Sequence, residues 1–220
     1  MTSDRTQIVK FVYAGLAGPL SIIPLKNLLA KGIIPEAILV PAPARHPRNL
    51  NLLPVKPPQN IASLAALAID AGLPLISWQK GYEAEIEADL EAISPDLVIM
   101  SCFPWRVTEP LLAIPSLGWW NLHPSLLPAY RGPNPLYWQL EAGETKTGIS
   151  LHQVDAGLDT GPVIAQQRCA LTATMELENE LAQLGANLII ESLQKQQQGN
   201  LVATPQDETL ASYQSFPDQE

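Results

Sequence analysis

The sequence predicts an α/β fold, in which a mostly parallel β-sheet is flanked by helices. Up to residue 133, short apolar runs rich in β-branched residues alternate with longer segments of helical character. Of the 220 residues, 46% are hydrophobic and 16% are charged, so the chain can bury a large core and does not have the composition of a disordered protein.

The elements of the first part follow one another in a regular order. Short apolar runs predict strands over residues 8–14, 37–40, 75–78, 96–101 and 118–122. Longer segments, two of them closed by a glycine, predict helices over residues 20–30, 61–71 and 82–93. A proline-rich loop is expected over residues 41–58. Since strand–helix–strand units connect neighbouring strands in the same direction, these strands should form a parallel sheet covered on both faces.

The pattern changes after residue 133. A short helix over residues 135–142 is followed by two segments, 147–154 and 162–170, that are expected to form a pair of strands. Thr174 should then cap a long helix. This helix carries an apolar stripe that faces the core, formed by Leu177, Leu181, Leu184 and Leu188. From residue 199 onward the chain is polar and lacks strong periodicity.

Charge and cysteine usage exclude several classes of protein. Thirteen Lys and Arg against 22 Asp and Glu give a net charge of −9, which argues against non-specific coating of nucleic acid. Cys102 and Cys169 show no CxxC spacing, so neither a disulfide framework nor a zinc module is expected. The chain shows no secretory signal and no apolar stretch of about 18 residues. We therefore expect a cytoplasmic protein that uses no metal and binds no membrane.

A glycine-containing segment, Gly15-Leu16-Ala17-Gly18, follows the first expected strand. Phosphates are bound at this position in doubly wound folds. The full G-x-G-x-x-G pattern is absent, and no acidic residue stands about 20 residues further on. The segment is therefore interpreted as a tight turn that needs glycine, and a dinucleotide-dependent dehydrogenase is not favoured.

The residues that could carry chemistry lie in two segments of the second half. Asn121 and His123 alternate along a strand that Pro124 ends, so both side chains should lie on one face at the carboxyl edge of the sheet. Chemistry in such folds takes place at this edge. Asp155 and Asp159 lie in a second segment, whose glycines and Pro162 predict a loop.

Together, an amide, an imidazole and a carboxylate suit one type of reaction. The Asn121 amide can donate to an oxygen that gains negative charge. His123 can exchange a proton near neutral pH, and a carboxylate such as Asp159 beside it would stabilise the imidazolium. No G-x-S-x-G motif is present and Cys102 has no visible activating partner. The set therefore favours direct attack of a substrate amine on a bound acyl donor.

These segments resemble the formyltransferase family that uses 10-formyltetrahydrofolate. The resemblance is carried by N-L-H-P-S-L-L-P at 121–128, Y-R-G at 130–132, G-E at 143–144, T-G at 147–148 and L-D-T-G at 158–161. It runs from about residue 8 to 193 and implies a Rossmann-like catalytic domain. It also implies that Asn121 and protonated His123 stabilise the tetrahedral oxyanion while Asp159 supports His123. Water would help to move the proton from the amine to N10 of the leaving folate.

The same resemblance implies where the folate donor binds. Its pterin ring is expected against the loop after strand 96–101 and against the loop that contains Asp159. The expected donor-binding residues are Phe103, Pro104, Trp105, Arg106, Val107, Asp155, Ala156, Gly157 and Leu158. Contacts to the first of these loops are often made by the backbone in this family, and Pro104 has no N–H to donate.

Within the family, the chain is most similar to the methionyl-tRNA formyltransferases, which makes initiator tRNA a candidate acceptor. The similarity lies in a basic loop at 43–56 and a tail segment at 206–213. Those enzymes carry a second, C-terminal domain. We expect a catalytic domain over 1–198 and, over 199–220, a C-terminal tail or the start of a linker to such a domain. The expected acceptor-binding residues are Arg45, Arg48, Ser125, Leu126, Leu127, Pro128, Arg131 and His152.

Several alternatives stay open at this point. Sugar-nucleotide N-formyltransferases, or enzymes that act on other small amines, share the expected core, and the net charge of −9 weakens the case for tRNA. His152 could be a satisfied core group, Asp155 could cap a turn, and Arg131 could brace its own loop. The basic loop could be a solvated surface. Two other classes are a metal hydrolase that uses His123, His152, Asp155 and Asp159, and a folate-binding module without transfer activity.

Overall fold

The structure is a computed structural model, and it describes residues 9–42 and 63–217. In this part of the chain seven strands form one sheet in the order β3-β2-β1-β4-β5-β6-β7. The strands are β1 (Phe11–Gly15), β2 (Ala37–Pro41), β3 (Leu75–Trp78), β4 (Leu97–Ser101), β5 (Trp119–His123), β6 (Lys146–Gln153) and β7 (Val163–Ala170). Strands β1 to β5 are parallel, and β6 and β7 are added antiparallel. The predicted mostly parallel sheet is confirmed.

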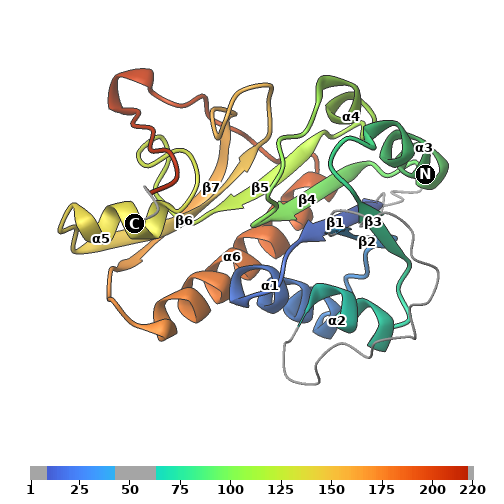
Figure 1. Ribbon diagram of the computed structural model, residues 1–220, viewed down its shortest axis with the longest axis horizontal. Helices are drawn as coiled ribbons and strands as arrows, with labels where there is room; N and C mark the ends of the chain where they lie inside the picture. The colour runs from blue at the N-terminus through green and yellow to red at the C-terminus, as the bar shows by residue number, and fades with distance from the viewer. Residues whose placement is uncertain (1–8, 43–62, 218–220) are drawn as a thin grey trace, which may run out of the picture.

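Helices cover both faces of this sheet (Figure 1). They are α1 (Pro19–Ala30), α2 (Leu64–Asp70), α3 (Glu83–Ile93), α4 (Glu109–Ala113), α5 (Pro135–Glu141) and α6 (Met175–Gln197), with a 3-10 turn at Glu208–Leu210. Helices α1, α2 and α6 pack on one face, and α3 and α4 pack on the other. Helix α4 was not expected from the sequence, because its five residues are too few to show a helical period.

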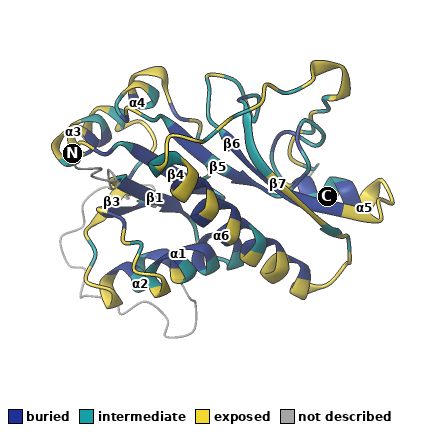
Figure 2. Cartoon of the chain, turned by 180° about the vertical axis from the view of Figure 1, so that it is seen from behind, coloured by how far each residue is buried: buried dark blue, intermediate teal, exposed yellow. Residues whose placement is uncertain are grey.

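The strands are buried at the centre of the molecule (Figure 2). In β1, Phe11 and Tyr13 belong to the core under α1 and α6, whereas Val12 and Ala14 belong to the core under α3 and α4. This alternation explains why the run has no polar position: both of its faces are covered.

The long helix α6 lies on the sheet as its apolar stripe predicts. Leu177, Leu181 and Leu188 are buried, and Leu184 packs against the same core. Thr174 occupies the N-cap position, but its side chain makes no capping hydrogen bond. Its hydroxyl lies 3.2 Å from that of Thr172 instead, so the predicted N-cap position is confirmed but the capping hydrogen bond is absent. Among the described residues, no helix combines the length and the apolar character that crossing a membrane requires.

Gly15 ends β1 and Gly18 precedes α1, and each position favours glycine for a different reason. Gly18 has a φ of +109°, which favours glycine. A Cβ at Gly15 would lie 2.8 Å from the Ser21 hydroxyl and 2.9 Å from the Ser101 carbonyl oxygen. The Ser21 hydroxyl donates to that carbonyl at 2.7 Å, so α1 is held against the ends of β1 and β4. The glycine at 15 is thus required by close packing of the protein on itself.

The polar tail folds back over the carboxyl edge of the sheet. Thr204 pairs with Val163 and Tyr213 pairs with Arg131, although neither pair extends into a strand. In Figure 1 the tail runs past β7 and the loop beyond β5 toward α5. A domain boundary at residue 198 stays a prediction, but the residues after it pack against the preceding ones.

Candidate active site

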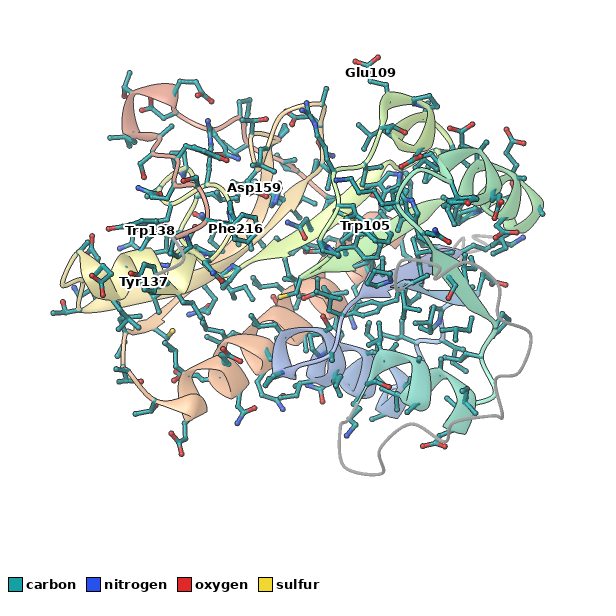
Figure 3. The ribbon with its side chains drawn as sticks, in the orientation of Figure 1. Trp105, Glu109, Tyr137, Trp138, Asp159 and Phe216 are labelled. Atoms are coloured by element: carbon teal, nitrogen blue, oxygen red, sulfur yellow. The ribbon has the colours of Figure 1, made fainter. Side chains whose placement is uncertain are left out.

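A cleft of about 940 Å³ opens at the carboxyl edge of the parallel strands. It is lined by the loops that follow β1, β4 and β5, by the loop between β6 and β7, by α5 and by the tail. In the view of Figure 3, Asp159 lies between Trp105 on one side and Tyr137 and Phe216 on the other. The topology thus places the expected chemistry where parallel sheets leave a crevice.

Asn121 and His123 reach this cleft from the last residues of β5. Between them, Leu122 points to the opposite face and packs in the core under α6. Two polar side chains therefore share one face of a strand that is otherwise apolar, as the spacing predicts. Both are held on a regular strand, which fixes their directions more firmly than a loop would.

Asp159 joins them from the loop between β6 and β7. Its Oδ2 lies 3.6 Å from His123 Nδ1, and its Oδ1 lies 3.5 Å from both His152 Nε2 and Asn121 Nδ2. The Asn121 amide also lies 3.2 Å from His152 Nε2. Four polar side chains from β5, β6 and the following loop thus converge on one point, with the Asp159 carboxylate at its centre.

Backbone groups hold the outer side of each imidazole. His123 Nε2 lies 2.8 Å from the Tyr130 carbonyl oxygen, and His152 Nδ1 lies 2.7 Å from the Gln153 carbonyl oxygen. A carbonyl accepts only, so each of these nitrogens carries a proton. A neutral His152 then presents an unprotonated Nε2, which can accept from the Asn121 amide. For His123 both nitrogens face acceptors, and only the imidazolium can donate to both.

The pKa values of the group follow from burial and from mutual contact. Burial raises the pKa of Asp159, but its contacts with His152 and His123 and the hydrogen bond from the Gly132 N–H outweigh that effect and lower the pKa to about 2. Burial lowers the pKa of His123 below its usual value, against the opposing effects of Asp159 and the Tyr130 carbonyl. At neutral pH the site of the free protein therefore holds a carboxylate beside a neutral imidazole.

A model of the formyl transferase family matches residues 41–193, which is more than half of the chain. The chain belongs to the formyl transferase family. A methionyl-tRNA formyltransferase from Chloroflexus aggregans is 37% identical over 168 residues, which cover 75% of this chain and 52% of that protein. Across eight such relatives the matched part covers between 47% and 64% of their own length, so the chain spans little more than half of them.

Solved structures show the same fold. Glycinamide ribonucleotide transformylase 1 from Symbiobacterium toebii superposes with a TM-score of 0.70 at 22% identity, over 90% of this chain and 95% of that one. An N-formyltransferase from Helicobacter canadensis, in complex with folinic acid and dTDP-3-aminofucose, gives 0.69 at 22% identity, over 94% of this chain and 71% of that one. The Rossmann-like formyl transferase architecture is therefore confirmed.

Most of the donor-binding residues expected from the formyl transferase family line the cleft. They are Phe103, Pro104, Trp105, Arg106, Val107, Asp155, Gly157 and Leu158; Ala156 is not among the residues that line it. Trp105 and Phe103 stack edge to face at 5.7 Å between ring centroids. The Asp155 carboxylate accepts from the Gly157 N–H at 3.0 Å and from the Thr160 hydroxyl at 2.6 Å. It caps its own turn, so it does not join His123 and Asp159 as the metal hydrolase alternative requires.

The acceptor-binding residues expected from the sequence take different places. Arg45 and Arg48 lie outside the described residues. His152 lines the cleft, whereas Ser125, Leu126, Leu127 and Pro128 do not. Ser125 and Leu127 are buried and support the loop: Ser125 Oγ donates to the Ala129 carbonyl, and the Leu127 N–H donates to Ser150 Oγ. These four residues therefore support the loop after β5 and do not line the cleft.

Arg131 binds the tail with its side chain. Arg131 is only 6% exposed, and its guanidinium binds Gln206 and Glu208 of the tail. It is not among the cleft-lining residues.

Several residues of the site were not singled out from the sequence. The Gly132 N–H donates to Asp159 Oδ2 at 2.9 Å, and Gln206 binds the backbone of the Asp159 loop. Tyr137, Leu140, Tyr213 and Phe216 form an exposed apolar wall of the cleft, and Figure 3 shows Tyr137 and Phe216 on the side away from Trp105. Gly132 stands in the Y-R-G motif and Gln206 in the tail segment, but neither pattern reveals a bond to Asp159.

Cys102 lines the cleft beside Phe103. Burial is the main factor that raises the pKa of its thiol, to about 11, so the thiol is not a nucleophile at neutral pH. Within residues 9–42 and 63–217, no three His, Cys, Asp or Glu side chains form a group that could hold a metal ion.

Proposed function

We propose that the chain transfers a formyl group from 10-formyltetrahydrofolate to a primary amine by direct attack. The observation that supports this most is the convergence of three side chains in one cleft. Asn121 Nδ2 lies 3.5 Å from one oxygen of the Asp159 carboxylate, and His123 Nδ1 lies 3.6 Å from the other. The family match supports the same reaction class. The set contains a hydrogen-bond donor, a proton carrier and a fixed negative charge but no strong nucleophile, which suits a transfer without a covalent enzyme intermediate.

In this reaction the amine nitrogen adds to the formyl carbon, and the carbonyl electron pair moves onto the formyl oxygen. The Asn121 amide, which otherwise donates to His152, and His123 are the groups that would stabilise this oxyanion. The intermediate then collapses, the bond from carbon to N10 breaks, and the amine's proton passes through water to N10. His152 would help to orient Asn121 and Asp159.

The charge on His123 would change during the reaction. In the free chain burial keeps its pKa low. An oxyanion beside the ring adds a second negative charge to that of Asp159, and nearby negative charge favours the imidazolium. Because both ring nitrogens face acceptors, the protonated ring would donate to the Tyr130 carbonyl and pair with the Asp159 carboxylate. The site would therefore hold a protonated His123 when the tetrahedral intermediate is present.

The donor would bind at the end of the cleft formed by residues 103–107 and 155–158. Aromatic and apolar side chains on the first loop offer a surface for the flat pterin ring. The Helicobacter canadensis enzyme, solved with folinic acid, has the same fold. Pro104 removes one backbone donor, so contacts on this side would fall to neighbouring N–H groups.

The acceptor would enter from the opposite end, past the apolar wall of Tyr137, Leu140, Tyr213 and Phe216. Methionyl-tRNA is the first candidate, because the relatives with 32–37% identity are methionyl-tRNA formyltransferases. An amino-sugar nucleotide is the second, because an N-formyltransferase that was solved in complex with dTDP-3-aminofucose has the same fold. Residues 1–198 would form the catalytic domain, and a cytoplasmic location follows from the substrates.

An acceptor screen tests this proposal. The purified chain is incubated with 10-formyltetrahydrofolate and, in separate reactions, methionyl-tRNA, an amino-sugar nucleotide and glycinamide ribonucleotide, and release of tetrahydrofolate is measured. We expect turnover with one acceptor and its loss in Asn121→Ala. Asn27→Ala is the matched control, because Asn27 pairs with Gln183 on the exposed side of α1. No turnover with any acceptor, in a chain that binds the donor, would leave a folate-binding module as the better description.

A further inference from the structure

Gln206 lies 47 residues after Asp159 in the chain and binds the loop that carries it. Its Nε2 donates to the Asp159 carbonyl oxygen at 2.9 Å and to the Gly161 carbonyl oxygen at 2.7 Å. Asp159 has a φ of +55°, a conformation that L-residues rarely adopt. The two accepting carbonyls lie on either side of Thr160. The two hydrogen bonds therefore hold the backbone in the turn that points the Asp159 carboxylate at His123.

Arg131 fixes the orientation of this amide. Its Nε and Nη2 donate to Gln206 Oε1 at 3.1 and 2.9 Å, and its Nη1 and Nη2 donate to Glu208 at 2.9 and 2.7 Å. A guanidinium only donates, so the oxygen of the Gln206 amide faces Arg131 and the nitrogen faces the loop. Both the oxygen and the nitrogen of the Gln206 amide are hydrogen-bonded, and only one orientation of the amide allows this.

The same tail also holds the loop that carries the partner of His123. The Tyr130 N–H donates to Ser212 Oγ at 2.8 Å, and the Arg131 N–H donates to the Ser212 carbonyl at 2.9 Å. The carbonyl of Tyr130 in turn faces His123 Nε2. The tail thus binds the backbone on both sides of the imidazole–carboxylate pair.

We propose that Gln206 is a positioning residue that sets the distance between Asp159 and His123 from a tail outside the expected catalytic domain. The inference rests on the proposed function for its effect on turnover, but not for its effect on the imidazole. Loss of the Gln206 amide nitrogen frees the loop, moves the carboxylate away from His123 and removes an effect that raises the pKa of that ring.

Gln206→Leu is the test variant, because it removes the N–H donor at a similar side-chain size and adds no charge that would itself shift the pKa of His123. Gln214→Leu is the matched control: it lies in the same tail, and its Oε1 has no hydrogen-bond partner in the described part of the chain. For each protein we would measure kcat, the KM for the folate donor, the melting temperature and the titration of His123 by NMR. The chain has three histidines, and a His123→Asn spectrum assigns the signal.

In Gln206→Leu we expect kcat to fall on the order of 10- to 100-fold with a donor KM within about 2-fold of the wild type. The pKa of His123 should fall, and Gln214→Leu should match the wild type. An unchanged His123 titration overturns the proposal, even where kcat falls or the protein melts earlier, because it leaves Gln206 with a role in folding alone. If the wild type formylates nothing but the His123 shift appears, the proposed function fails and the positioning role stands.

Discussion

The backbone N–H of Gly132 donates to Oδ2 of Asp159 at 2.9 Å and so joins the loop after β5 to the loop between β6 and β7. Each loop contributes one residue to this contact, and Gly132 and Asp159 are 27 residues apart in the chain. The bond occupies one lone pair of the carboxylate with a donor that cannot titrate. It helps to keep the Asp159 pKa low and to aim the other oxygen at His152 and Asn121.

Gly132→Ala should disrupt this junction. Gly132 has a φ of +100°, and a Cβ there would collide with the Gln214 carbonyl oxygen and the ring of Tyr213. We expect a loss of at least about 1–2 kcal/mol in unfolding free energy and a large fall in turnover. Gly143→Ala is the control, because its φ is +70° but a Cβ there meets nothing within 4 Å. Denaturant unfolding of both variants separates the collision from backbone strain, and equal losses would contradict the packing argument.

Asn121→Ala should lower kcat by roughly 100- to 1,000-fold, or about 3–4 kcal/mol of barrier, because it removes a donor to the developing oxyanion. Its KM for the donor should change little, since the formyl oxygen gains most of its charge in the transition state. Steady-state kinetics on wild type and variant provide the measurement. A variant with wild-type kcat would remove Asn121 from the mechanism.

Asp159→Asn should lower turnover at pH 7 by at least about 100-fold. The Asp159 carboxylate raises the pKa of His123, so an amide at this position leaves the ring still harder to protonate. Asp96→Asn is the control, because Asp96 accepts from the Lys10 N–H at the opposite end of the sheet. A normal rate and an unchanged pH profile in Asp159→Asn would contradict the assigned role.

Asp159 also makes stability depend on pH. Its pKa is about 2 in the folded chain against 3.8 for a free carboxyl, so the folded state favours the charged form. The resulting stabilisation, about 2 kcal/mol, is fully present above pH 4 and is lost as the pH falls through 2. Urea unfolding between pH 5 and 2 should show a steeper loss for the wild type than for Asp159→Asn. Parallel curves would show that the carboxylate is not held in this way.

The strands and most helices were predictable because their apolar periods report directly on burial. The run L-V-I-M at 97–100 has no polar position, and the structure covers β4 on both faces. Asn121 and His123 were predictable for a related reason, since a two-residue spacing before a proline fixes a shared face at the end of a strand. Helix α4 was missed because five residues do not define a period.

The residues that hold the loops of the site in place could not be predicted from sequence periodicity. Serine and leucine at 125 and 127 stand in the motif beside His123, yet they are buried under the loop, and Arg131 turns to the tail instead of the cleft. A motif gives residue types and spacing, whereas the direction of a loop side chain depends on what packs against it.

The sequence by itself determined the sheet, its helical layers and the three side-chain types of the reaction, because burial and strand alternation are local properties of the chain. Only the tertiary structure decided that Gly132 and Gln206 form hydrogen bonds with Asp159. Those bonds run from a backbone N–H and a side-chain amide across 27 and 47 residues to a loop in the left-handed region, and contacts of that separation leave no periodic trace in the chain.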